Sequence, residues 1–214
     1  MSHSEYKGRR ETREVKIGNV TVGGGSPIAI QSMTFTKTSD RDTTLAQILE
    51  LEKAGCEIVR FSVPDEACAA SIPFLKEHTH VPLVADIHFN YRLALLAAEY
   101  GIDKIRINPG NIGDKDRVKQ VVDVCKKRNI PIRIGVNGGS LERELLQKYG
   151  GVTADALVES AMGHVAILDE LNFNNVVVSI KISDVPKMLC AYRKFNEISD
   201  IPLHIGVTES GTLK

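Results

Sequence analysis

Two periods of apolar residues alternate along most of this chain. Short runs rich in Val and Ile are followed by longer segments in which apolar residues recur at helical spacing, as at Leu157, Ala161, Val165 and Leu168. The short runs are apolar almost throughout, which is typical of strands buried on both faces of a parallel sheet. The pattern therefore predicts a protein in which strands and helices alternate.

The alternation predicts an N-terminal hairpin followed by seven strands and six intervening helices. The hairpin spans residues 14–22, which alternate around Gly18-Asn19, and we expect it to cover one end of the fold. The strands span residues 28–33, 58–62, 82–87, 104–108, 131–136, 175–182 and 202–207. The helices span 43–53, 66–77, 91–100, 115–128, 154–171 and 184–197, with a short helical piece at 141–149 inside an insertion. Asp42 and Asp114 are the expected N-caps of two of these helices.

This order of elements favours an α/β (β/α)8 barrel of the TIM type. A doubly wound sheet is less consistent with the chain, because no dinucleotide-binding fingerprint opens the first unit. Seven strands do not close an eight-stranded barrel, so we expect a barrel truncated after about seven strands, with the hairpin as a lid. The expected organisation is a flexible tail over residues 1–13 and an incomplete TIM-barrel substrate-binding domain over residues 14–214.

Polar residues stand near the ends of the predicted strands, in many cases two or four positions apart. Residues at that spacing point to the same face of a strand. In barrels and open sheets of this type, ligands bind at the carboxyl ends of the strands. We therefore expect these side chains to share one pocket: Arg60, Asp86, His88, Arg106, Asn108, Arg133, Asn137, Lys181, Ser183 and His204.

The charges of this set are unbalanced. Four cations, Arg60, Arg106, Arg133 and Lys181, face at most two carboxylates, Asp86 and Glu209. Burial of unpaired charge is costly, so the imbalance predicts an anionic ligand. The planar fork of arginine fits two phosphate oxygens at once, which favours phosphate over a simple carboxylate. The alternative is that each arginine pairs with a carboxylate from a neighbouring loop.

Two loops add to the phosphate interpretation. Residues 108–111 (Asn-Pro-Gly-Asn) form a tight turn whose backbone N–H groups point toward one spot, and residues 137–140 (Asn-Gly-Gly-Ser) precede the short helical piece. Glycines before a helix N-terminus provide a site for phosphate. Both sequences are also common turns, so neither is specific alone.

Five residues are considered as candidates for chemistry. Asp86 and Glu209 are the expected acid–base residues, and His88 is placed to donate to a phosphate or to move a proton. His204 is as often a packed core residue as a ligand contact. Lys181 has a second reading, because burial among arginines lowers the pKa of a lysine and suits it to form a Schiff base.

Composition excludes several classes of protein. The chain has 214 residues, of which 43% are hydrophobic and 25% charged, with zero net charge, as in an ordinary globular domain. It shows no basic stripe for nucleic acid and no run of about 18 apolar residues for a membrane span. The polar N-terminus lacks a signal sequence, and the four cysteines include no CxxC pair. We expect reduced cysteines, no metal site and a cytoplasmic location.

Six sequence blocks, in order, carry a specific resemblance. They are IAIQSMT (28–34), VADIHF (84–89), KIRINPGNIG (104–113), IRIGVNGGSL (132–141), VVSIKIS (177–183) and PLHIGVTESG (202–211). With them the chain, over roughly residues 10–214, resembles the barrel domain of the 4-hydroxy-3-methylbut-2-enyl diphosphate synthases. Six ordered blocks are far more specific than any one motif.

The resemblance implies an activity and a set of roles. Members of this family reductively open 2-C-methyl-D-erythritol 2,4-cyclodiphosphate in isoprenoid biosynthesis, using two electrons from ferredoxin or flavodoxin through a [4Fe–4S] cluster. By motif position, phosphate contacts fall to Arg60, His88, Arg106, Arg133 and Lys181. Asp86, Asn108 and Asn137 would contact the hydroxyl-bearing carbons or orient neighbours, and Glu209 would supply a proton.

The chain departs from the family pattern in one respect. In the family, three cysteines and one glutamate of a C-terminal domain hold the cluster, and head-to-tail homodimers bring that domain over the partner's barrel. The sequence contains no such domain, so we expect this polypeptide to be inactive alone. Two alternatives stay open, namely a Schiff-base (class I) aldolase-like barrel that uses Lys181 and a non-catalytic ligand-binding barrel fragment.

Overall fold

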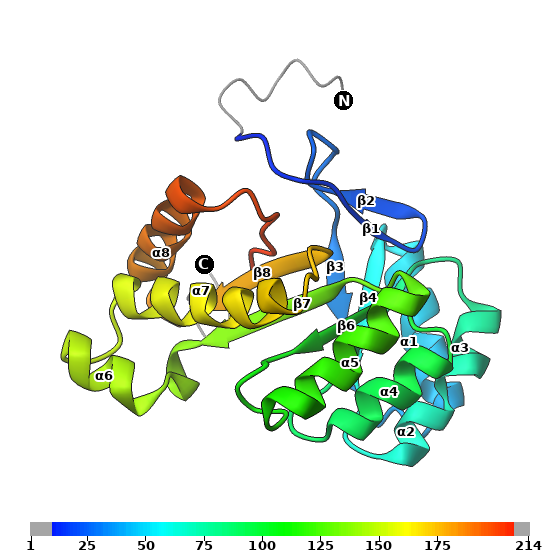
Figure 1. Cartoon of the computed structure of the whole chain (residues 1–214). Coiled ribbons are helices and arrows are strands. Elements are labelled where there is room, and N and C mark those ends of the chain that lie inside the picture. Colours follow the sequence, from blue (N-terminus) through cyan, green and yellow to red (C-terminus); the bar gives the residue numbers. More distant parts are fainter. Residues whose placement is uncertain (1–9, 208–214) are drawn as a thin grey trace.

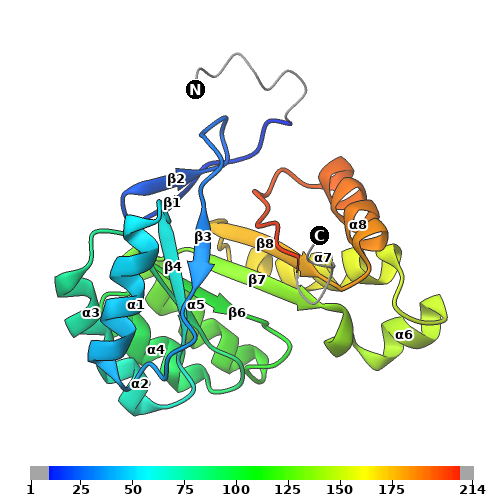
Figure 2. The same ribbon diagram turned by 180° about the vertical axis from the view of Figure 1, so that it is seen from behind.

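A six-stranded parallel sheet forms the centre of the computed structural model, which describes residues 10–207. The strands follow one another in the order of the chain: β3 (Gln31–Met33), β4 (Ile58–Ser62), β5 (Leu83–Asp86), β6 (Lys104–Ile107), β7 (Ile132–Asn137) and β8 (Val176–Lys181). A separate antiparallel hairpin, β1 (Val15–Ile17) and β2 (Val20–Val22), precedes them. Figures 1 and 2 show β3 and β8 at the two edges of the curled sheet, with the hairpin beyond one end of its strands.

Helices follow the strands and lie around the outside of the curl (Figure 1). They are α1 (Arg41–Lys53), α2 (Glu66–Ala70), α3 (Ile72–His78), α4 (Tyr91–Glu99), α5 (Lys115–Arg128), α6 (Arg143–Tyr149), α7 (Ala154–Glu170) and α8 (Val185–Ile198), with a 3-10 turn, η2 (Gly138–Ser140), before α6. This arrangement of parallel strands and outer helices confirms a TIM-like α/β fold with about half of a barrel and an N-terminal hairpin.

Local chemistry accounts for most helix boundaries. The carboxylate of Asp114 accepts a hydrogen bond from the backbone N–H of Arg117, so α5 begins where the sequence predicts. The cap of α1 is Asp40 instead of Asp42, and the helix begins two residues earlier than predicted. The helix predicted over 66–77 is two helices, because Pro73 in the first turn of α3 is compatible with a new start after Ser71.

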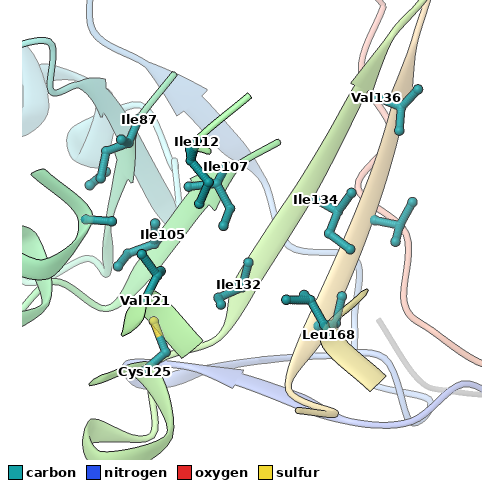
Figure 3. Close-up of a cluster of buried hydrophobic side chains, with 14 of the residues drawn as sticks. Ile87, Ile105, Ile107, Ile112, Val121, Cys125, Ile132, Ile134, Val136 and Leu168 are labelled. Carbon is teal, nitrogen blue, oxygen red and sulfur yellow. The ribbon is translucent and has the colours of Figure 1, made fainter. Parts of the chain in front are cut away.

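Strand residues that point outward form the main core with the helices. Ile105, Ile107, Ile132 and Ile134 are completely buried, and Figure 3 shows them beside side chains of α5 and α7 such as Val121 and Leu168. The intervening residues of the same strands point inward. Because outward positions are apolar and inward ones largely polar, one alternation along each strand provides both the core and the site.

The predicted seventh strand, residues 202–207, is present only as a single parallel bridge between Leu203 and Val178. The backbone N–H of His204 donates to the carbonyl of Val178 at 2.8 Å, and the hydroxyl of Tyr192 donates to the carbonyl of His204 at 2.8 Å. The segment therefore lies along β8 and α8, although its hydrogen bonds do not continue as a strand ladder.

The hairpin packs against the amino ends of the strands. Val15 and Ile17 are each 1% exposed and form a small apolar cluster with Ile58, Val84 and Val177. Backbone hydrogen bonds from Arg13 to Asp200 and from Gly24 to Thr12 tie residues 12 and 13, which the sequence placed in the tail, to the rest of the fold. We call this cluster, Val15, Ile17, Ile58, Val84 and Val177, the apolar end of the half-barrel.

Candidate anion-binding site

A cavity of about 520 Å³ opens at the carboxyl ends of the inner strands. Eight of the residues predicted for the pocket line it, namely Arg60, Asp86, His88, Arg106, Arg133, Asn137, Lys181 and Ser183. Gly138, Gly139, Ser179 and Ile182 complete the wall. We call this cavity the anion pocket.

The register of the sheet explains the convergence. Asp86 on β5 is paired with Arg106 on β6, Arg106 is paired with Arg133 on β7, and farther along β7 Asn137 is paired with Lys181 on β8. Cross-strand partners in a parallel sheet point to the same face, so their side chains meet inside the curl.

Within residues 10–207, Asp86 is the one carboxylate that lines the pocket. Its Oδ1 accepts a hydrogen bond from Nη1 of Arg106 at 3.1 Å, and its Oδ2 lies 3.8 Å from Nε of Arg60. His88, whose side chain is half exposed, places Nε2 3.7 Å from Oδ1 of Asp86. Arg60 also contacts the sulfur of Met33 with Nη2 at 2.8 Å. One carboxylate thus serves two arginines and a histidine.

Arg133 has no hydrogen-bond partner for Nε, Nη1 or Nη2 among residues 10–207, and it is 0% exposed. Burial, followed by the charges of Arg60 and Arg106, lowers its pKa to about 9, which still leaves the guanidinium protonated at neutral pH. A buried cation without a partner is costly, and a ligand that supplies acceptors removes that cost.

Lys181 is half buried at the far wall of the pocket. Burial, followed by the nearby charges of Arg60, Arg133 and Arg106, lowers its pKa to about 8, while Asp86 opposes the shift. The sequence prediction that arginines surround this lysine is therefore consistent with its position. Near neutral pH the amine carries a proton that it loses readily.

Two glycines allow the pocket to be built. A Cβ at Gly135 would lie 2.5 Å from Nε of Arg106, so this inward position on β7 must stay empty for the arginine to cross it. A Cβ at Gly138 would lie 3.2 Å from side-chain atoms of Ile182 and Val152. The predicted loop 137–140 therefore reaches the pocket closely, through Asn137, Gly138 and Gly139.

Asn108 is buried but does not line the pocket. Its Oδ1 accepts the backbone N–H of Gly110 at 3.0 Å, and its carbonyl accepts that of Asn111 at 2.9 Å. These two N–H groups are already bonded, so the turn 108–111 does not present them to an anion as the sequence suggested. An asparagine that bonds its own turn is a common alternative to a ligand contact.

His204 lines a second cavity, of about 500 Å³, between β3, the hairpin and residues 202–206. Burial and the charges of Arg133, Lys104, Lys181 and Arg60 lower its pKa to about 2, so the imidazole is neutral. Arg60 and Lys181 line both cavities. His204 therefore lies near the cationic cluster but outside the anion pocket.

Lys104 is a fifth basic residue of this cluster, and the sequence analysis missed it. It is 2% exposed, and its Nζ donates to Oε1 of Gln31 on β3 at 3.1 Å. Burial and the charges of Arg133 and Arg60 lower its pKa well below the usual range. Lys104 lies two residues before Arg106, a spacing that identifies it as an inward residue. It was missed because it begins β6, whereas the sequence analysis considered polar residues near the carboxyl ends of the strands.

Glu209, the second acid–base candidate, lies outside the described residues. Within residues 10–207, no group of three or more His, Cys, Asp and Glu side chains is arranged to hold a metal ion. Cys56, Cys68 and Cys125 are buried as free thiols, and Cys190 is exposed. None of the helices in that range is long and apolar enough to span a membrane.

Comparisons with solved structures agree with the fold. A truncated 3-deoxy-D-arabino-heptulosonate 7-phosphate synthase from Thermotoga maritima has a TM-score of 0.65 at 12% identity, covering 90% of this chain and 68% of that one. A 7,8-dihydropteroate synthase from Vibrio fischeri has a TM-score of 0.61 at 12% identity, covering 89% and 76%. At such identities the likeness shows the fold alone.

Sequence comparisons identify the family. The 4-hydroxy-3-methylbut-2-en-1-yl diphosphate synthases (flavodoxin) of Lysinibacillus sphaericus and Bacillus cytotoxicus are each 57% identical over 210 residues, which cover 98% of this chain and 57% of theirs. The chain thus spans little more than half the length of the curated relatives that it matches. Residues 12–214 match the family described as the GcpE TIM-barrel domain. The chain therefore belongs to the GcpE family, of which it carries the TIM-barrel domain.

Proposed function

We propose that this chain is the substrate-binding barrel of a 4-hydroxy-3-methylbut-2-en-1-yl diphosphate synthase, and that the anion pocket binds the diphosphate of its substrate. The full reaction would reductively open 2-C-methyl-D-erythritol 2,4-cyclodiphosphate and eliminate water. The relatives that support this proposal carry that enzyme name and cover nearly all of the chain.

One observation supports the binding role most strongly. The Arg133 guanidinium is completely buried, without a hydrogen-bond partner among residues 10–207, beside two further arginines and Lys181. Asp86 alone balances these charges within the pocket lining. A diphosphate brings both negative charge and several acceptor oxygens, so it satisfies the pocket in a way that a neutral ligand does not.

The roles of the pocket residues follow from their positions. Arg106 and Arg133 lie deep and would bind phosphate oxygens, while Arg60 and Lys181 bound the pocket on either side. Asp86 holds Arg106 in place and would orient the hydroxyl-bearing part of the substrate. Asn137, Ser183 and the exposed His88 line the mouth, and Glu209 remains the proposed proton donor.

A [4Fe–4S] cluster supplies two electrons in this family. The described residues do not fit such a group, because their cysteines are scattered and no metal-holding set is formed among them. We therefore derive no step through a cluster from this chain. Flavodoxin is the proposed electron donor because the relatives' names include it. Ferredoxin as an alternative donor, a homodimer and a cytoplasmic location are proposals that rest on the sequence alone.

Calorimetric titration of the chain with pyrophosphate tests the binding role. Arg133→Met should weaken binding at least about tenfold while it leaves the thermal midpoint unchanged or higher, since it removes an unpaired buried charge. Lys119→Met, at an exposed cation on α5, serves as the matched control and should bind as wild type does. Equal affinities of wild type and Arg133→Met would contradict the proposal.

A Schiff-base aldolase is the second candidate, and the lowered pKa of Lys181 is the observation that favours it. Borohydride reduction in the presence of an aldehyde or ketone phosphate, followed by peptide mass mapping, would trap an adduct on Lys181 if that chemistry occurs. We expect no adduct. A non-catalytic fragment would instead bind pyrophosphate but would not increase the turnover of a complete synthase to which it is added.

A further inference from the structure

Helix α7 contacts both the β7–α6 loop, which lines the anion pocket, and the neighbouring β6–α5 turn, through a polar cluster in which Ser160 and His164 are buried and Glu142 is exposed. We propose that Glu142, Ser160 and His164, here called the α7 clamp, position the β7–α6 loop for anion binding, an inference that rests on the binding function proposed above. The two loops are the β6–α5 turn, residues 108–111, and the β7–α6 loop, residues 137–142.

Glu142 is the centre of the clamp. It ends the β7–α6 loop as the N-cap residue of α6, and its Oε1 accepts the hydroxyl of Ser160 at 3.1 Å. Nε2 of His164 lies 3.1 Å from the same oxygen, at the distance of an ion pair. Ser160 and His164 are four residues apart on α7, so both point from one face of the helix toward the loop.

His164 also contacts the β6–α5 turn. A Cβ at Gly110 would lie 2.9 Å from Cε1 of the imidazole, so the turn rests directly against the ring. His164 is only 5% exposed, and its Nε2 lacks a partner with proper hydrogen-bond geometry among residues 10–207. One buried side chain thus touches both loops.

The loop that Glu142 ends is part of the pocket wall. Asn137, Gly138 and Gly139 line the cavity, and the hydroxyl of Ser140 donates to the carbonyl of Asn137 at 3.3 Å. Leu141 attaches the loop to the main core, where it is 7% exposed, and Glu142 adds a polar attachment at the next position. Holding its end at Glu142 therefore limits where Asn137 and the two glycines lie.

A second attachment of α6 to α7 provides a matched control. Glu159 of α7 accepts hydrogen bonds from two residues at the C-terminal end of α6, from Nζ of Lys148 at 2.6 Å and from the hydroxyl of Tyr149 at 2.6 Å. These contacts join the same two helices but lie away from the pocket wall. Their loss should affect α6 without moving residues 137–139.

The experiment compares pyrophosphate affinity by calorimetry in wild type, Glu142→Ala, Glu142→Gln and Glu159→Ala. Glu142→Ala should weaken binding about tenfold. Glu142→Gln keeps an oxygen acceptor for Ser160 and should restore affinity to within about twofold of wild type. Glu159→Ala should bind as wild type does, although it loosens α6.

Gly110→Ala gives an independent test, because its methyl group would meet the ring of His164. We expect Gly110→Ala to weaken pyrophosphate binding. The double variant Gly110→Ala/His164→Ala should recover part of that loss, because it removes the clash. Amide hydrogen exchange of residues 108–111 and 137–142 should rise in Glu142→Ala and stay unchanged in Glu159→Ala. This readout reports on the clamp even where no anion is bound.

The outcomes separate the clamp from the function on which it rests. If wild type binds pyrophosphate but Glu142→Ala binds equally well, or Glu159→Ala is weakened as much, the clamp is wrong and the pocket stands. If wild type does not bind pyrophosphate, the proposed function fails. In that case, unchanged exchange in Glu142→Ala would overturn the clamp as well.

Discussion

The two ends of the half-barrel are built from inward positions of the same strands. They differ in how far their side chains find packing or hydrogen-bond partners within the chain. At the apolar end, Val84 and Val177 pack with the hairpin residues Val15 and Ile17. Two positions farther along the same strands, at the carboxyl end, Asp86 follows Val84 and Ser179 follows Val177. Both polar residues line the anion pocket with Arg106 and Arg133. The apolar end is packed by contacts within the chain beside the second cavity, whereas at the carboxyl end Nε of Arg106 and all three side-chain nitrogens of Arg133 have no acceptor among residues 10–207.

Along a single strand, residues at the apolar end therefore contribute to stability, and residues at the carboxyl end contribute to ligand binding. Apolar burial favours folding without any ligand, at roughly 25 cal/mol per Å² of area removed from water. A cluster of like charges works against folding until an anion neutralises it. Substitutions at the apolar end should therefore change stability, and those at the anion pocket should change binding with little loss of stability.

The largest expected effect is at the apolar end. Ile17→Ala removes a side chain that is 1% exposed, and its cavity should lower the free energy of unfolding by about 2–5 kcal/mol. Urea denaturation measures this change, with Lys16→Ala, at an exposed position of the same strand, as the control. Pyrophosphate affinity of the folded Ile17→Ala protein should be unchanged, and a parallel loss of affinity would break the separation.

Arg106→Ala should produce the next largest effect, on binding. It removes a charged hydrogen-bond donor, worth about 1.5–3 kcal/mol, or roughly 10- to 150-fold in pyrophosphate affinity. Arg117→Ala, at an exposed arginine of α5, is the control and should leave calorimetric titrations unaltered. A variant that loses stability but retains affinity would show that Arg106 belongs to the core instead.

Lys104→Met tests the buried lysine at the start of β6. Replacing a buried lysine with an apolar side chain of similar length should raise the free energy of unfolding by about 1 kcal/mol at neutral pH and weaken pyrophosphate binding. Because burial lowers the pKa of folded Lys104, the unfolded chain binds an extra proton up to the ordinary value of 10.5. Wild-type stability should thus rise relative to the variant as pH increases toward 10.5, so the difference in unfolding free energy between them should narrow. Urea denaturation at two pH values measures this difference, and an unchanged difference would contradict the prediction.

The smallest effect is a pH dependence from Lys181. Its pKa of about 8 means that the amine loses its charge as pH rises through 8, so affinity for sulfate, whose charge is constant in this range, should fall about fivefold between pH 7 and 9. Lys181→Arg keeps its charge and should flatten the curve. An unchanged slope in Lys181→Arg would assign the titration to another group.

Sequence pattern predicted the polar convergence because strand alternation is a local property. Asp86, Arg106 and Arg133 meet as the two-residue spacing implies, and the register supplies the cross-strand pairing. The spacing rule could not show that Asn108 would bond its own turn, since a short polar side chain after a strand has backbone partners within reach. It also could not pair Lys104 with Gln31, which is 73 positions away in the chain.

The remaining differences arise from tertiary context. Residues 202–207 have the composition of a strand, but a ladder also needs continuous partners, and only Leu203 forms a bridge with β8. His164 has the spacing of a helical core residue, and nothing local indicates that Glu142 and Gly110 lie against it. The sequence therefore predicts which face a residue occupies better than it predicts which neighbour the residue meets.

The alternation along β7 has a consequence for tolerance to changes in length. Ile132, Ile134 and Val136 point outward, while Arg133, Gly135 and Asn137 point inward. Deleting one residue within this strand would exchange the two sets, so that a guanidinium would enter the core and isoleucines would fill the pocket. A deletion in a loop between two elements exchanges no inward and outward positions. Relatives of this chain should therefore vary in length between elements and keep the phase within each strand.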